Sequence, residues 1–148
     1  MSHSTVTNLL HVVWSTRSRK DIIPQHVLTR LWEYFIGIGY NKGIPVIAVG
    51  GMRNHVHLGI ELPATTKLSD AISVFKANSS RWLKQQGVKD LPWQTGYGAF
   101  SFGIPQLGQV KKYIHNQAEH HKKYSFEEEF LELLKRAGVD YDPHHVFD

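Results

Sequence analysis

Two histidines separated by one residue, His55 and His57, are the side chains best suited to chemistry in this sequence. They lie in an apolar run, 55–62, that is typical of a strand, and successive side chains of a strand point to opposite faces of the sheet. The apolar residues of this run would therefore share one face, and the two imidazoles would share the other, where both could bind one metal ion. Such a pair is more often a surface or hydrogen-bonded pair, so a metal site needs a third ligand.

A tyrosine and a glutamine four positions apart, Tyr113 and Gln117, form the second candidate group. Residues at this spacing lie on the same side of a helix, where Tyr113 offers a hydroxyl and Gln117 an amide oxygen that suits a hard or borderline cation. The buried stripe of the same helix is expected to consist of Val110, Ile114 and Ala118. Alone, this pair is more often helix decoration, and it gains meaning only beside the two histidines.

The elements that would position these residues alternate between strands and helices. We expect strands at 5–16, 44–51, 55–62 and 96–104, and helices at 68–83, from Pro105 to about Lys123, and from Pro24 until Gly39 and Gly43 end it. This order predicts an α+β fold, the ferredoxin-like split βαβ arrangement with an antiparallel sheet, helices on one face, and extra C-terminal helices. The other face would be open to a flat, extended ligand, although this fold alone does not determine function.

Length and composition indicate a single domain over residues 1–148, of which about 125–148 would form an acidic C-terminal helix and tail. No run approaches the roughly 20 apolar residues of a membrane span, and the first residues do not resemble a signal peptide. A soluble cytoplasmic protein is therefore expected. The sequence has no cysteine, which excludes disulfides, thiolate metal sites and a cysteine nucleophile.

The charge is distributed unevenly along the chain. Residues 1–124 hold 15 Lys and Arg against 6 Asp and Glu, whereas residues 125–148 hold 2 against 7. A basic body suits binding to phosphates, although a solvated lysine-rich surface is an equal alternative. The candidate DNA contacts are Arg17, Arg19 and Lys20 after the first strand, and Lys111 and Lys112 beside the tyrosine. For Trp93, Tyr97 and Phe100, a place in the core is favoured over base stacking.

Several motifs accompany the histidine pair in a fixed order, namely Trp93-Gln94, Gly96-Tyr97-Gly98-Ala99 and Tyr113-Ile114-His115-Asn116-Gln117. Together they resemble the single-tyrosine HUH transposases of small bacterial insertion sequences, the IS200-like transposase superfamily. The first two motifs, with His120-His121 before Ser125-Phe126 and Glu129, are similar to the branch that includes the REP-associated tyrosine transposases. The resemblance runs from about His11 to Leu134.

The resemblance implies a transposase that cuts and rejoins single-stranded DNA through a 5′-phosphotyrosine, with a divalent metal, Mg²⁺ or Mn²⁺. Tyr113 would be the nucleophile, and the metal ligands would be His55, His57 and Gln117. The implied partners are single-stranded DNA with hairpin structure and a second copy in a homodimer whose active sites are shared in trans. The glycines at 103 and 108 would provide the hinge for that exchange.

Two departures from the family pattern are Asn54, where many members have Asp, and Gly59, where a larger apolar residue is common. Neither removes a catalytic group. The alternatives are a domesticated REP-associated endonuclease, a noncatalytic single-strand nucleic-acid binding module, and a nuclease in which water attacks. Tyr124 is the weaker candidate nucleophile. His120 and His121 could approach the metal as a substitute ligand or bind phosphate, but positions at the surface are favoured.

Overall fold

The centre of the fold is a four-stranded antiparallel sheet with the strand order β2-β3-β1-β4. The structure is a computed structural model and describes residues 1–89 and 92–148. The strands are β1 (Leu9–Ser15), β2 (Val46–Met52), β3 (His55–Glu61) and β4 (Gly98–Phe102). The chain divides into two compact units, residues 1–117 and 118–148, and the whole sheet belongs to the first. That residues 1–148 fold as one domain is still a prediction.

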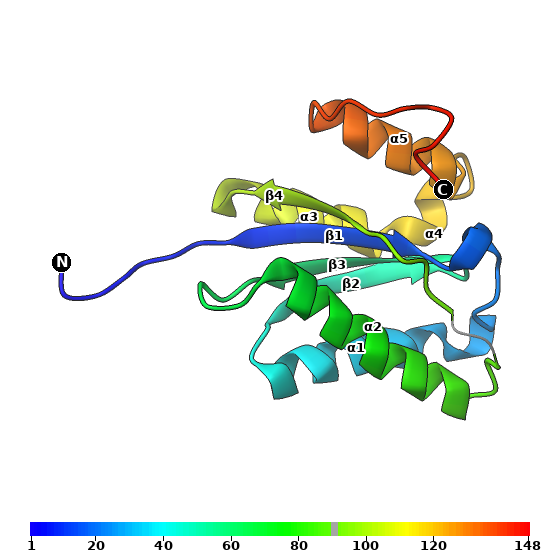
Figure 1. Cartoon of the computed structure of the whole chain (residues 1–148), viewed down its shortest axis with the longest axis horizontal. Helices are drawn as coiled ribbons and strands as arrows, with labels where there is room; N and C mark the ends of the chain where they lie inside the picture. Colours follow the sequence, from blue (N-terminus) through cyan, green and yellow to red (C-terminus); the bar gives the residue numbers. More distant parts are fainter. Residues whose placement is uncertain (90–91) are drawn as a thin grey trace. The chain divides into compact units, whose positions relative to one another are not determined.

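Two helices, α1 (Leu28–Lys42) and α2 (Leu68–Gln85), cover one face of the sheet (Figure 1). The alternating apolar residues of β1 and β3 point toward them and are buried, namely Leu10, Val12, Trp14, Val56, Leu58 and Ile60. From α1, Phe35 packs edge-on against Trp14 with the ring centroids 5.9 Å apart. Gly43, in the left-handed conformation (φ 70°), ends α1. The α+β, split βαβ fold class is confirmed.

The opposite face of the sheet carries α3 (Leu107–His115), which packs on β2 and β3. Two glycines on this face make room for the helix. A Cβ atom on Gly50 would lie 2.1 Å from the carbonyl oxygen of Ile114, and one on Gly59 would lie 3.4 Å from Ile114 Cδ1. The face expected to be open is therefore partly covered, by the helix that carries Tyr113.

Gly50→Ala is expected to displace α3 and to lower the free energy of unfolding by about 1–3 kcal/mol, the usual effect of overpacking. The reason is that the new methyl group would overlap backbone, which cannot rotate away as a side chain can. Thermal and urea unfolding would measure the change. Gly59→Ala is the matched control, because its nearest neighbours would lie at ordinary contact distances; an equal loss in both variants would contradict this account.

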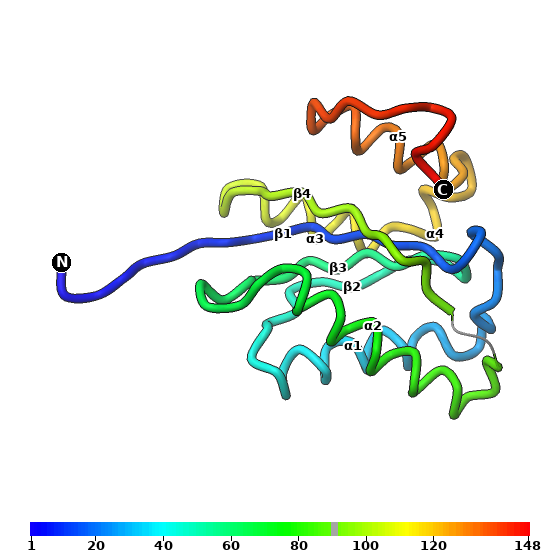
Figure 2. Tube along the Cα trace, in the orientation of Figure 1, coloured from blue at the N-terminus to red at the C-terminus, as the bar shows by residue number. Residues whose placement is uncertain are grey.

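The first strand and the third helix are among the elements whose boundaries differ from those expected. β1 starts at Leu9, not at residue 5, and the first residues form an exposed extended segment that leads away from the sheet (Figure 2). The third helix does not run to Lys123. It ends at His115, where Asn116 N–H donates to the carbonyl of Tyr113, three residues earlier, in the pattern of a 3-10 turn. A short helix, α4 (Gln117–His120), follows. Of the expected stripe only Ile114 is buried, while Ala118 is exposed.

The second unit contains α5 (Phe126–Arg136), which begins with a capping box. The Ser125 hydroxyl accepts a hydrogen bond from Glu128 N–H, and the Glu128 carboxylate accepts one from Ser125 N–H. Phe130 packs against Phe126 and Phe147 with ring centroids 5.9 and 6.1 Å apart. Among the helices that the structure describes, none has the length and apolar character needed to cross a membrane.

Candidate active site

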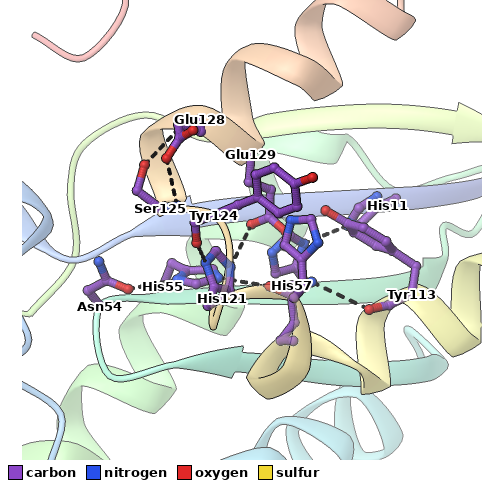
Figure 3. Close-up of polar contacts among 12 residues, drawn as sticks. His11, Asn54, His55, His57, Tyr113, His121, Tyr124, Ser125, Glu128 and Glu129 are labelled. Atoms are coloured by element: carbon purple, nitrogen blue, oxygen red, sulfur yellow. Dashed lines mark hydrogen bonds and ion pairs between the residues drawn. The ribbon is translucent and has the colours of Figure 1, made fainter.

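His55 and His57 lie side by side on the face of the sheet that carries α3 (Figure 3). Strand alternation places them there, and pairing with β1 sets His55 opposite Ser15 and His57 opposite Val13. Their ring centroids are 5.1 Å apart, and a ring nitrogen of each lies within 4.8 Å of one of the other. Both side chains are buried. The two imidazoles are therefore fixed close enough to serve one ion.

Two amide side chains hold the ring of His55. The Oδ1 atom of Asn54 lies 2.7 Å from His55 Nδ1, and Oε1 of Gln117 lies 3.0 Å from His55 Nε2. Each amide nitrogen donates to a backbone carbonyl, from Asn54 to Arg19 at 3.3 Å and from Gln117 to Tyr113 at 3.4 Å. These carbonyls orient both amides with their oxygens toward the imidazole.

His11 holds the second imidazole. Its Nε2 atom lies 2.7 Å from Nδ1 of His57, and the two rings are stacked with centroids 5.0 Å apart. His11 is on β1 and points to the same face as His57. The signal that identifies it is cross-strand register, which the sequence does not provide.

Tyr113 reaches the histidines from α3 (Figure 3). Its ring centroid lies 5.8 Å from that of His57 and 5.8 Å from that of His11, edge-on to both. Although Gln117 begins α4 rather than continuing α3, the break at Asn116 still leaves it against His55. The structure thus brings together the four residues that sequence reasoning singled out for chemistry.

The donor set fits a divalent cation. A neutral imidazole carries one N–H, so His55 can donate to only one of the two oxygens that face it. Ligand atoms that bind one ion at about 2.1 Å and at right angles lie about 3.0 Å apart, as His55 Nε2 and Gln117 Oε1 do. Imidazole nitrogen and amide oxygen suit borderline and hard ions such as Mn²⁺ and Mg²⁺.

Asn54→Ala is expected to weaken Mn²⁺ binding by about 10–100-fold, the usual effect of losing a partner that orients a ligand. Asn54→Asp should retain the affinity, because a carboxylate oxygen can accept the same hydrogen bond from His55 Nδ1. Calorimetric titration with Mn²⁺ would measure both. Equal affinities in the wild type and the alanine variant would contradict a role in orienting His55.

The candidate DNA contacts lie in two places. Arg17, Arg19 and Lys20 belong to the turn after β1, where Arg17 and Lys20 are exposed and Arg19 is partly buried. Lys111 and Lys112 are exposed on α3, the helix that carries Tyr113. Of the aromatic residues considered for stacking, Trp93 is in the core and donates to Ser79 Oγ at 2.9 Å, whereas Phe100 is partly buried and Tyr97 is 39% exposed.

In the second unit, two histidines pair with one carboxylate. The Nε2 atoms of His120 and His121 lie 3.3 and 3.2 Å from Glu129 oxygens, and His121 Nδ1 lies 2.7 Å from the carbonyl of Tyr124. The two side chains are partly buried, with 26% of His120 and 8% of His121 exposed, rather than fully at the surface as expected. Burial opposes the charged form of His121, but its hydrogen bond to Glu129, the charge of that residue and the Tyr124 carbonyl together raise the pKa of His121.

A raised histidine pKa stabilises the folded state at low pH. This contribution is complete below the unfolded pKa of about 6.5 and is lost as the pH rises through the higher folded value. We therefore expect His121→Gln to lower the melting temperature more at about pH 6 than at about pH 8. Scanning calorimetry of both proteins would measure the difference, and an equal decrease at the two pH values would contradict the prediction.

Known proteins resemble this chain in sequence. The family described as "Transposase IS200 like" matches residues 5–117, which end where the first unit ends. The ISDra2 transposase TnpA of Deinococcus radiodurans is 24% identical over 114 residues, covering 72% of this chain and 81% of that protein.

Two solved structures share the fold. One, assigned as a transposase of Deinococcus radiodurans R1, has a TM-score of 0.59 and 22% identity, covering 79% of this chain and 96% of the other. The second, a REP-associated tyrosine transposase bound to a REP hairpin, has a TM-score of 0.58 and 17% identity, covering 82% of this chain and 74% of the other. With the family matching most of its length, the chain belongs to the IS200-like transposases.

Proposed function

We propose that this transposase cuts and rejoins single-stranded DNA with Tyr113 as the nucleophile. The observation that carries the proposal is the position of Tyr113, whose ring lies 5.8 Å from that of His57, beside the contact between His55 and Gln117. In this arrangement a hydroxyl nucleophile adjoins three ligands for a divalent ion. If water were the nucleophile, as in the nuclease alternative, the reaction would not need a tyrosine hydroxyl beside these ligands.

The reaction follows from the chemistry of these groups. The Tyr113 oxygen attacks phosphorus and loses its proton, the bond from phosphorus to the 3′-oxygen breaks, and that oxygen takes up a proton to leave as a 3′-hydroxyl. The DNA remains attached as a 5′-phosphotyrosine, so a later 3′-hydroxyl can reverse the step and rejoin strands. A divalent metal, Mg²⁺ or Mn²⁺, held by His55, His57 and Gln117 would stabilise charge on the nonbridging phosphate oxygens.

The DNA would be single-stranded and would contain a hairpin. Support comes from the similar fold of the REP-associated transposase, which is bound to a REP hairpin, and from the basic residues near the site. Arg17, Arg19, Lys20, Lys111 and Lys112 would contact phosphates. The enzyme would act in the cytoplasm, at the nucleoid. A domesticated REP-associated endonuclease would use the same chemistry. Inverted repeats at the borders of the gene would indicate a mobile element, whereas repeats scattered across the genome would indicate a domesticated endonuclease.

The test is to trap the covalent intermediate. Labelled single-stranded hairpins from the flanking DNA are incubated with the protein and Mn²⁺, denatured, and separated by electrophoresis. We expect a labelled protein band that requires the metal and whose tryptic map assigns the nucleotide to the peptide with Tyr113. Cleavage without any covalent band, even in rapid-quench samples, would favour water as the nucleophile.

We further propose a homodimer in which the tyrosine helix is exchanged between subunits, because strand transfer needs two DNA ends held together. In the single chain, Tyr113 lies beside its own histidines. The segment before α3 is exposed, with Ile104 59% exposed and Gly103 and Gly108 close by, which supports its use as a hinge.

Mixing two inactive proteins tests this exchange. Tyr113→Phe is combined with the double variant His55→Ala/His57→Ala under conditions that allow subunits to exchange. An exchanged dimer regains cleavage at one composite site, built from the histidines of one chain and the tyrosine of the other. A strictly cis enzyme stays inactive in every mixture, and a monomer in sedimentation at assay concentration would reject the dimer.

A further inference from the structure

A basic groove of about 700 Å³ lies in the first unit, away from the tyrosine and the histidine pair. One wall is α2, and the other is formed by residues 93–95 together with Arg17. Trp93 joins the two walls by donating to Ser79 of α2 at 2.9 Å, and Arg17 N–H donates to the Pro92 carbonyl at 2.9 Å within the second wall. Its volume is within the range of about 300–1,000 Å³ that ligand sites occupy.

The face of α2 that lines the groove has a small-residue floor and a cationic edge. Ser73, Ala77 and Ser80 recur at helical spacing along this face. The cations along the groove are Arg17, Lys76, Arg81, Lys84 and Lys89. Among the lining residues, all of which lie in the part of the chain that the structure describes, none is acidic. The groove is therefore complementary to a polyanion.

Lys76 is built into the wall of the groove. Its ammonium group donates to the carbonyls of Gln94, Thr95 and Gly96 at 2.8, 3.1 and 2.8 Å, and it lies 5.9 Å from the ring centroid of Tyr97, which is 39% exposed. Burial lowers the pKa of Lys76 to about 8, so a nearby anion would favour its charged form. An exposed aromatic ring beside a cation is a platform on which an unpaired base can stack.

The groove is connected to the active site through Gln94. The Oε1 atom of Gln94 accepts hydrogen bonds from Ser15, with the backbone nitrogen at 2.6 Å. Ser15 is the register partner of His55. An extended ligand in the groove would thus run beside the end of the sheet at which His55 lies.

We propose that this groove binds the sugar-phosphate backbone of unpaired DNA. The identification of the ligand as DNA rests on the proposed function. Two walls that both carry cations suit a single DNA strand, which a basic groove can follow without reading sequence. Arg81 and Lys84, exposed and three residues apart on α2, are the expected phosphate contacts.

The experiment measures binding without cleavage. In a Tyr113→Phe background and with a chelator present, fluorescence anisotropy follows binding of an oligothymidylate of about 20 nucleotides, which is longer than typical single-strand binding sites. Arg81→Ala/Lys84→Ala should bind about 10-fold more weakly, and the slope of log K against log salt should fall by about 1.4, or 0.7 for each lost contact. Lys42→Ala/Lys135→Ala removes the same charge from exposed helix positions outside the groove and should bind as the parent does.

A second variant separates shape from charge. Ala77→Trp keeps every cation and fills the floor at an exposed helix position, so it should also weaken binding. The proposal is overturned if both groove variants bind like the control, or if polyglutamate of equal length displaces the DNA as well as unlabelled oligothymidylate does. Because the assay needs neither metal nor nucleophile, a failure to form covalent adducts would reject the proposed chemistry and leave this result intact.

Discussion

Replacing Tyr113 by phenylalanine is expected to lower formation of the covalent protein–DNA adduct by more than about 10³-fold. Only the attacking oxygen is removed, and the ring that packs edge-on against His57 and His11 remains. Affinity for the uncleaved hairpin should therefore stay within about 3-fold, since no phosphate contact is lost. Electrophoresis of denatured reactions measures the adduct, and anisotropy measures the affinity.

Tyr124→Phe is the matched control for this substitution. Tyr124 is a second tyrosine close to Tyr113 in the sequence, and it is 49% exposed. It should form adduct at the wild-type rate. A covalent product that persists in Tyr113→Phe and disappears in Tyr124→Phe would identify Tyr124 as the nucleophile instead.

His55→Ala and His57→Ala are each expected to abolish Mn²⁺-supported cleavage and to weaken Mn²⁺ binding more than the roughly 100-fold that an orienting partner contributes. The loss is large because each variant removes a metal ligand and also a hydrogen bond. His55→Ala removes the hydrogen bond with Gln117, and His57→Ala removes the one with His11. Gln117→Ala should have a smaller effect, since an amide oxygen is the poorest of the three ligands. Calorimetric titration and adduct formation would be measured together.

The control for these variants is His115→Ala, which removes an exposed imidazole from α3. Its metal affinity should equal that of the wild type. Because His55 and His57 are buried, circular dichroism must first show that each variant is folded. Folded variants with unchanged Mn²⁺ affinity would place the metal elsewhere.

Strand alternation was enough to predict the central part of this site. The spacing of His55 and His57 within an apolar run determines that both share a face, because the period of a strand is two. The order of strands and helices likewise predicted the fold class. These features depend on residues close together in sequence, which is why they could be read before the structure.

The parts that could not be predicted depend on long-range packing. The contact of His11 with His57 follows from the register between β1 and β3. The end of α3 before Asn116 has no proline or glycine to signal it, so helical periodicity suggested one continuous helix. The pairing of His120 and His121 with Glu129 likewise joins residues whose contact no local pattern predicts.

The two glycines under α3 let this helix lie close to the sheet with few side chains between them. Ile114 is the one buried residue of the helix, and burial of one isoleucine side chain contributes about 1.5–3 kcal/mol. The packing of Tyr113 against His57 and His11 adds to this contribution. Because α3 buries a single side chain, its release during an exchange between subunits would expose little apolar surface and would leave the sheet beneath it intact.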